Sequence, residues 1–213
     1  MYNPRWFKED RLELLHAEIK EIAFGTLVTA TKTSGIMASH IPIMLDPEKG
    51  ERGTLFGHIA RGNAQWRETV AGSEALVMFL GPDAYITPRW YQTKKQGDGR
   101  VVPTWNYVAI HARGPIAFFE DQAWLKEAVT RLTARHESGA EDPWEVRDAP
   151  TEYIEGQLKT IVGFEVPISK LEGKRKMSQN RPDADYMGVV SGLEERGLAR
   201  DLDVSKEMRA DKS

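Results

Sequence analysis

The chain has 213 residues, of which 40% are hydrophobic and 29% are charged, and its formal net charge at pH 7 is −3. This composition indicates one compact globular domain with appendages, and the small negative charge gives no general attraction to nucleic acid. Cysteine is absent, which excludes disulfides, thiolate nucleophiles and cysteine-ligated metals. The start lacks a signal-peptide pattern and no run reaches the ~18 apolar residues of a membrane span, so we expect a cytoplasmic protein without a membrane partner.

The first half of the chain predicts one helix and a meander of strands. Apolar residues recur at helical spacing from Leu12 to Ile22, which predicts a helix over about residues 10–23 that ends at Gly25. Strands are expected at 26–31, 37–45, 54–56, 74–80 and 84–91, with a short helix at 63–70 and a strand break at Gly81-Pro82.

The second half mixes helices with fewer strands. We expect an exposed polar loop, or a lid, at 94–100, a β-prone run at 104–119 interrupted at Gly114-Pro115, helices at 121–136, from 151 and at 183–196, a last strand from 163, and a basic turn at 170–176. One domain over residues 1–200 and a charged, frayed tail over 201–213 follow from this pattern. Because helices do not regularly separate the strands, the fold class is β-dominated α+β, a small barrel with flanking helices.

The stretch over residues 57–63 carries the strongest functional signal. It lies where the strand ending at Phe56 meets the helix expected to begin at Asn63. Such a corner gathers unpaired backbone N–H groups, and here it also carries the guanidinium of Arg61. The sequence therefore predicts a binding site for a phosphate monoester. The alternative is an ordinary surface arginine beside a helix cap.

Four motifs resemble one known family. They are GHIARGNAQW at 57–66, GPDAYITPRWY at 81–91, VPTWNY at 102–107 with His111 beyond it, and KMSQNR at 176–181. In this order they are similar to the PaiB-type family of FMN-binding negative transcriptional regulators, and the likeness spans nearly the whole chain. Ala64, Met177 and Trp6 depart from the family pattern, where proline, leucine and histidine are usual. The departure at Ala64 weakens the argument for a helix start there.

The resemblance implies a fold, a cofactor and an assembly. The fold would be a split β-barrel of the Greek-key, FMN-binding type, similar to pyridoxamine-phosphate oxidases and flavin reductases. The cofactor would be FMN, bound at the interface of a homodimer.

Candidate cofactor residues fall into two groups along the first half of the chain. At the corner, Arg61 would pair with phosphate, Asn63 would cap the helix beside it, and Ala60 would let the ligand approach the backbone. His58 would hydrogen-bond flavin or phosphate, or it is a packing residue. In split barrels of this kind, the strand containing Ser39, His40 and Ile41 would lay its backbone amides along the flavin ring; the alternative is a plain strand.

A third group lies further along the chain. Trp90, Tyr91, Trp105 and Tyr107 would stack on flavin, or they fill a core or a dimer interface. Polar residues beside them, Thr87, Thr104 and Asn106, suit a ligand pocket. Gln179 and Asn180 would close the site, or they belong to a solvated turn before the last helix.

Two classes of function remain open at this point. The first is a regulator, a repressor in which flavin changes the dimer and thereby gene expression; DNA is then a partner that neither charge nor a helix-turn-helix motif supports. The second is a flavin-dependent oxidoreductase, for which the sequence specifies no catalytic acid, base or substrate anchor. An apo scaffold for a protein partner comes third. Hydrolase motifs and metal-ligand spacings are absent, so no catalytic or metal residue is predicted.

Overall fold

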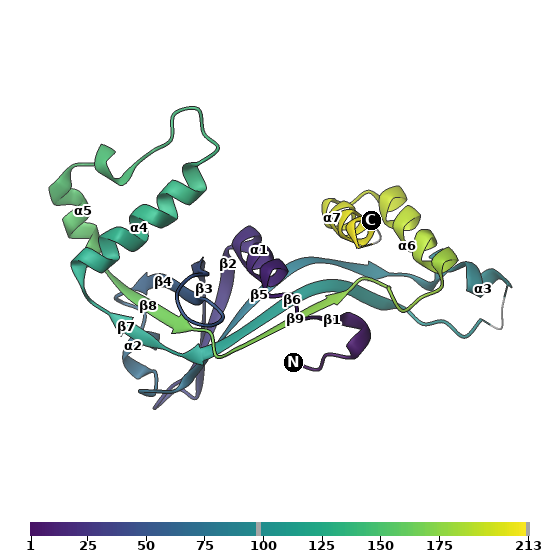
Figure 1. Cartoon of the computed structure of the whole chain (residues 1–213), viewed down its shortest axis with the longest axis horizontal. Helices are drawn as coiled ribbons and strands as arrows, with labels where there is room; N and C mark the ends of the chain where they lie inside the picture. The colour runs from purple at the N-terminus through teal and green to yellow at the C-terminus, as the bar shows by residue number, and fades with distance from the viewer. Residues whose placement is uncertain (97–98, 212–213) are drawn as a thin grey trace. The chain divides into compact units, whose positions relative to one another are not determined.

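The computed structural model describes residues 1–96 and 99–211 (Figure 1). The chain divides into two compact units. The central unit comprises Leu12–Phe79 and His111–Leu171, and the terminal unit comprises Met1–Arg11, Leu80–Ile110 and Glu172–Ser213. None of the helices in the described ranges is long and apolar enough to cross a membrane. The expectation of a single domain over residues 1–200 stays a prediction.

The described strands form an antiparallel sheet in the order β1-β9-β6-β5-β2-β3-β4-β8-β7. Their bounds are β1 Lys8–Glu9, β2 Phe24–Ala30, β3 Ile36–Asp46, β4 Thr54–Ala60, β5 Glu74–Ile86, β6 Thr104–Pro115, β7 Ala117–Phe119, β8 Ile161–Pro167 and β9 Lys170–Lys176. The helices are η1 Arg5–Phe7, α1 Leu12–Ile22, α2 Gln65–Glu68, η2 Pro88–Trp90, α3 Gln92–Gln96, α4 Gln122–Glu137, η3 Val146–Asp148, α5 Thr151–Leu158, α6 Asp183–Arg196 and α7 Ala199–Ala210. The β-dominated α+β class is confirmed.

Helix α1 packs against β3 in the central unit and buries Leu15 and Ile19. The helix ends at Ile22, because Ala23 after it has a φ of 53° in the left-handed region, and the expected stop at Gly25 is wrong. Gly25 lies inside β2, where an added Cβ would come within 3.0 Å of both Ile43 and Phe79. Close packing across the sheet therefore explains this glycine.

Several elements differ from the predictions in length or type. Strand β5 continues through Gly81-Pro82, where a break was expected. The expected polar loop at 94–100 begins as the end of α3, while Gly97 and Asp98 lie outside the described residues. The expected helix at 63–70 is only α2, four residues long. The interruption after Gly114-Pro115 is confirmed, since β6 ends at Pro115.

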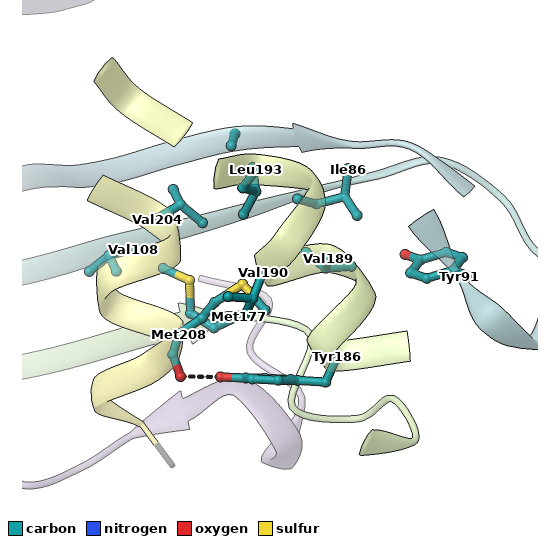
Figure 2. Packing of buried hydrophobic residues seen from close by; sticks show 11 residues of the cluster. Ile86, Tyr91, Val108, Met177, Tyr186, Val189, Val190, Leu193, Val204 and Met208 are labelled. Carbon is teal, nitrogen blue, oxygen red and sulfur yellow. Dashed lines mark hydrogen bonds between the residues drawn. The ribbon is translucent and has the colours of Figure 1, made fainter. Parts of the chain in front are cut away.

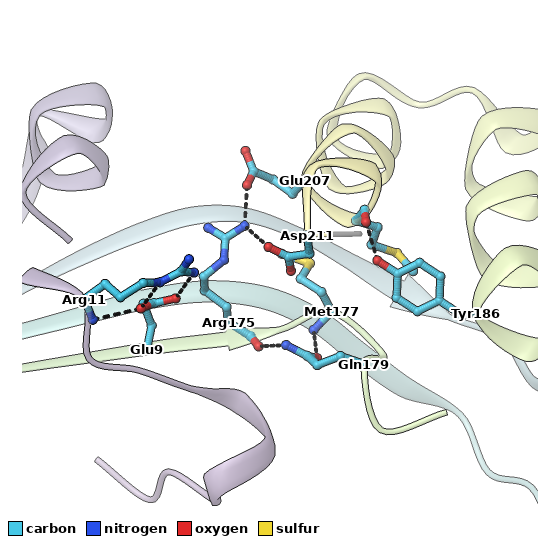
Figure 3. Close-up of polar contacts among 9 residues, drawn as sticks. Glu9, Arg11, Arg175, Met177, Gln179, Tyr186, Glu207 and Asp211 are labelled. Carbon is cyan, nitrogen blue, oxygen red and sulfur yellow. Dashed lines mark hydrogen bonds and ion pairs between the residues drawn. The ribbon is translucent and has the colours of Figure 1, made fainter. Parts of the chain in front are cut away.

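The basic segment 170–176 is strand β9 and not a turn. It pairs with β1, with Lys174 opposite Lys8. Arg175 is buried, and its Nη2 donates to Glu207 at 2.6 Å and to Asp211 at 3.0 Å (Figure 3). Lys174 is buried too and donates to the carbonyl of Tyr2 at 3.1 Å. Partners distant in sequence thus let these charges enter a strand, since buried charges need pairing.

The expected frayed tail is wrong, because residues 199–210 form helix α7. Val204 and Met208 are fully buried on this helix and pack with Val189, Val190 and Leu193 of α6 (Figure 2). The hydroxyl of Tyr186 also donates to the carbonyl of Met208. Only two apolar side chains of α7 need to reach this cluster. The charged sequence of α7 therefore did not indicate an ordered helix.

Gly192 of α6 lies against Trp90, and an added Cβ would come within 2.3 Å of the indole ring. We expect Gly192→Ala to lower the free energy of unfolding by about 1–3 kcal/mol, because overpacking displaces a rigid ring. Gly156→Ala in α5 is the matched control: no atom lies within 4 Å of the added Cβ. That change should be neutral or stabilising by up to about 1 kcal/mol. Urea unfolding of both variants measures the difference, and equal midpoints would contradict the packing.

Candidate functional site

A buried glutamine holds the corner between β4 and α2. The side chain of Gln65 is fully buried, and its Nε2 donates to the carbonyl of Leu27 at 3.2 Å, to Thr29 Oγ1 at 3.1 Å and to the carbonyl of Met37 at 3.3 Å. Its Oε1 accepts from Ser39 Oγ at 2.6 Å. These bonds tie the corner to β2 and β3 at once. The corner is therefore a fixed part of the sheet.

Asn63 completes this network. Its Nδ2 donates to Ser39 Oγ at 2.8 Å, and its Oδ1 accepts from the backbone N–H of Gln65 at 2.9 Å. The structure thus brings together Ser39 and Asn63, two of the predicted site residues. Ser39 links the side chains of Asn63 and Gln65, and Asn63 also binds the backbone of Gln65. We name the set Ser39, Asn63 and Gln65 the corner network.

Arg61 lies in the turn after β4, and its guanidinium is engaged by the protein. Nη1 forms an ion pair with Glu120, Nε donates to the carbonyl of Lys159 at 2.7 Å, and Nη2 donates to the carbonyl of Ile161 at 3.4 Å. A phosphate at this arginine must therefore share it with Glu120 or displace that carboxylate. With α2 only four residues long, the helix dipole adds little to anion binding here.

The backbone N–H groups of the corner are partly used. That of Arg61 donates to the carbonyl of Thr160 at 2.7 Å, and that of Asn63 donates to the carbonyl of Ala60 at 2.9 Å. Those of Gly62 and Ala64 make no such bond to the described residues. Two amide donors therefore remain at the corner, and Gly62 has nothing within 4 Å of an added Cβ. A ligand can approach the backbone at this point.

Strand β3 has one edge that is only half covered. Residues Ile36–Pro42 pair with β2, whereas β4 pairs with β3 only from Ile43 to Asp46. Among the described strands, the second edge of Ile36–Pro42 therefore has no partner. Ser39, His40 and Ile41 all lie on this segment, but only His40 turns its backbone groups to that edge, because those of Ser39 and Ile41 pair with β2. Its unpaired amides and carbonyls are available to a ligand because every backbone polar group seeks a partner.

The adjoining face of the sheet is apolar and open. On β2 the residues alternate: Gly25, Leu27 and Thr29 are buried, while their neighbours are not. The outward set across three paired strands is Phe24, Thr26, Val28 and Ala30 of β2, Ile36, Ala38, His40 and Pro42 of β3, and Leu76 and Met78 of β5. Phe24 is 58% and Ile36 is 76% exposed. We name this set the outer face.

His58 lies apart from the corner network. On β4 it is half-buried and lines a cavity with residues of α4 and α5, and neither Ser39 nor Asn63 lines that cavity. Burial lowers the pKa of its imidazole below the usual value. Ala60 ends β4 with an exposed side chain. The structure therefore separates His58 from the other corner residues.

The remaining predicted residues belong to the terminal unit, and most have structural roles there. Thr87 Oγ1 accepts from the N–H of Arg89 at 3.3 Å, capping η2. Asn106 is fully buried and accepts from Ser178 Oγ at 3.1 Å. Gln179 spans the carbonyl of Arg175 at 2.5 Å and the N–H of Met177 at 2.7 Å (Figure 3).

The aromatic candidates of the terminal unit differ in exposure. Trp105 is 47% exposed and packs edge-on against Tyr85, with ring centroids 6.0 Å apart. Tyr91 is fully buried in the cluster of Figure 2, which agrees with the core interpretation of that residue. Asn180 is exposed.

Comparison with known proteins bears directly on the corner and the β3 edge. The family model described as "Putative FMN-binding domain" matches residues 1–170, which include both features. The chain belongs to this family. FMN is the cofactor that the family is defined by. The KMSQNR segment lies beyond the matched residues.

Relatives in other organisms extend over most of the chain. "Protease synthase and sporulation protein PAI 2" of Bacillus subtilis is 36% identical over 194 residues, covering 91% of this chain and 89% of its own length. An uncharacterised protein of Emericella nidulans is 35% identical over 230 residues, covering 92% of each chain. The resemblance to the PaiB-type family is thereby confirmed.

Solved structures share the fold at low sequence identity. The FAD and heme binding protein of Mycobacterium smegmatis superposes with a TM-score of 0.56 at 16% identity, covering 79% of this chain and 73% of that chain. A flavocytochrome of Azotobacter vinelandii gives a TM-score of 0.55 at 11% identity, covering 85% and 75%. At such identities the likeness concerns the fold alone.

Sequence reasoning missed two residues of the site. Gln65 was absent from the candidates although it makes four side-chain bonds, and a glutamine inside the matching motif was its only signal. Glu120 was missed because it lies 59 residues from Arg61, and no local pattern links the two.

Proposed function

We propose that this protein is a homodimeric, split-barrel FMN-binding regulator of the PaiB type that represses transcription. The observation that carries the proposal is the unpaired edge of β3 beside the open outer face. A flavin ring needs hydrogen-bonding partners along its polar edge and apolar cover on its face, and these two features supply both kinds of contact. Family membership identifies the ligand as FMN.

The chain's own residues suggest how FMN would be held. The backbone N–H and C=O of His40 would face the polar edge of the ring, while those of Ser39 and Ile41 pair with β2 and the corner network fixes the position of β3. The amides of Gly62 and Ala64 with Arg61 would receive the phosphate. When bound, the flavin supplies one- or two-electron redox chemistry. The protein contributes position and exclusion of water.

A second copy of the chain is the proposed cover for the outer face. An apolar sheet face with Phe24 and Ile36 exposed is costly in water, and burying apolar area contributes about 25 cal/mol per Å². A twofold dimer would cover the same face on both copies. It would also shield the flavin from solvent, which agrees with a cofactor at the interface.

The regulatory role takes its support from the named relative. The Bacillus subtilis protein is named for protease synthesis and sporulation. In our proposal, the presence or redox state of FMN changes the dimer and thereby repression. Direct contact with DNA lacks support from charge, since the basic residues Lys174 and Arg175 are buried in β9 and paired within the chain. The expected cytoplasmic location stays a prediction.

A flavin-dependent oxidoreductase is the second candidate, and His40 favours it. The imidazole lies on the outer face beside the β3 edge, and its Nδ1 hydrogen-bonds Thr26 Oγ1 at 2.9 Å. An oriented imidazole next to a flavin can deliver a proton during hydride chemistry. The sequence and the described contacts provide no further group of that kind at the corner network.

The two candidates separate in one set of measurements. If the protein is a regulator, oxidised and reduced protein should differ in a promoter-specific, salt-sensitive mobility shift, alone or with a co-repressor from cell extract. Anaerobic mixing with NADH or NADPH should leave the flavin oxidised over minutes. Rapid bleaching that is slowed by His40→Gln, together with identical promoter occupancy in both redox states, would support the oxidoreductase.

Arg61 gives a sharp test of the phosphate position. Arg61→Ala should weaken FMN binding by about tenfold or more and leave riboflavin binding unchanged, because only FMN carries the charge that a guanidinium pairs with. Glu120→Gln should strengthen FMN binding, because it removes the competing carboxylate. Flavin fluorescence titration measures both ligands.

Arg67→Ala is the matched control for this test. Arg67 lies on α2 over the ring of Trp66, 5.0 Å from its centroid, and has no proposed ligand role. Its variant should bind both flavins as the wild type does. Equal loss of FMN and riboflavin in Arg61→Ala would remove Arg61 from the phosphate role and leave the β3 edge to be tested separately.

The dimer is tested on the outer face. Ile36→Glu should raise the dimer dissociation constant by ~100-fold or more, since a twofold interface would bury the new charge twice. Tyr153→Glu is the control, because Tyr153 is 59% exposed on α5 and lies outside the outer face. Sedimentation at matched concentrations gives the masses. A monomeric wild type, or equal masses for both variants, would contradict the proposal.

A further inference from the structure

A second cavity lies beneath α5, away from the corner network. It has a volume of about 260 Å³ and is enclosed by β4, α4, η3, α5 and the start of β8. Its apolar wall is formed by Val129, Trp144, Val146, Ile154, Leu158 and Ile161. Such a volume is close to the lower end of ordinary ligand pockets, about 300 Å³. The proposed flavin contacts do not use any of these residues.

Two of the polar side chains that line this cavity have no hydrogen-bond partner among the described residues. His58 and Thr133 both line it, and their side chains make no hydrogen bond to the described residues. His58 is half-buried, and burial holds its pKa below the usual value, so the ring is neutral at pH 7. An imidazole kept neutral by apolar surroundings accepts a hydrogen bond at one nitrogen and donates at the other. The cavity thus offers convergent hydrogen-bonding groups.

The charge of the lining residues determines which class of ligand this cavity can bind. None of its lining residues in the described part of the chain carries a formal charge at pH 7. The charged side chains Lys126, Glu145, Arg147 and Glu155 line the adjacent cavity of about 360 Å³, which shares five residues with this one. A charged ligand would lose hydration in this cavity without gaining a counter-charge from its lining. An uncharged ligand pays no such penalty.

The shape of the wall favours an aromatic ring. Trp144 is 45% exposed and lines both cavities, so an aromatic side chain is available to a ligand in either of them. Aromatic pairs gain about 0.5–1.5 kcal/mol beyond the burial of their area. The branched side chains of Val129, Val146 and Leu158 complete an apolar surround for a flat molecule.

We propose that this cavity binds a small uncharged aromatic molecule with one hydrogen-bond donor, of the indole or phenol class, which donates to His58. The ligand enters past Trp144 and contacts α4 and α5 together. Because α4 and α5 both form its wall, occupancy stabilises their contact. In a regulator this is a second input, independent of FMN.

Indole and 1-methylindole form the ligand pair for the test, because methylation replaces the N–H donor by a methyl group, and the variants below separate the loss of the donor from the added bulk. Both are titrated into the full-length, FMN-saturated protein and followed by two-dimensional NMR. Indole should shift the amide signals of residues 129–133 and 154–161 and bind about fivefold more tightly than 1-methylindole, the value of one net hydrogen bond. The flavin absorption spectrum should not change.

Variants connect this difference to the imidazole. His58→Phe should bind the two indoles equally, whereas His136→Phe, on the exposed surface of α4, should keep the fivefold difference. Thr133→Val provides a second variant in the wall if His58→Phe fails to fold, and it should weaken indole. Equal binding of both ligands to the wild type, signal shifts outside the named segments, or a perturbed flavin spectrum would overturn the proposal.

Discussion

A buried amide must find hydrogen-bond partners, and in this protein that requirement is met by Gln65. Its side chain joins two carbonyls and a hydroxyl on β2 and β3 with the hydroxyl of Ser39. Losing one partner would leave a polar group unsatisfied at a cost of about 1–3 kcal/mol. The corner at the end of β4 is consequently fixed, and the edge of β3 is held where β4 has left it.

This arrangement explains why the half-covered edge persists. Unpaired strand edges are liabilities in proteins, because they invite pairing with other chains. Here β4 leaves β3 after Gly57, the residue that pairs with Ile43, and the corner network holds the turn after β4 to Ser39 of β3. The remaining backbone groups stand beside an apolar face. In our proposal, a flavin and a second copy of the chain would satisfy both demands in one assembly, which neither ligand nor partner would do alone.

His58 of β4 belongs to a separate cavity. Its side chain lies among residues of α4 and α5, whereas the corner network joins β3 to the turn after β4 and to α2. Helices α4 and α5 pack by apolar contacts and leave a cavity in which the imidazole stays neutral. Our proposals therefore place two sites of distinct chemistry near one strand: His58 of β4 would serve an uncharged ligand, and Arg61 in the turn after β4 would serve a phosphate.

The sequence by itself determined the local elements and the family. Apolar periodicity located α1, α4, α5 and α6, and four motifs identified an FMN-binding protein. Only the tertiary structure decided that Lys174 and Arg175 enter a strand, that α7 is ordered, and that Arg61 is paired with Glu120. The reason is physical: period and capping act over a few residues, whereas the partners that neutralise a buried charge or cover a helix face come from distant parts of the chain.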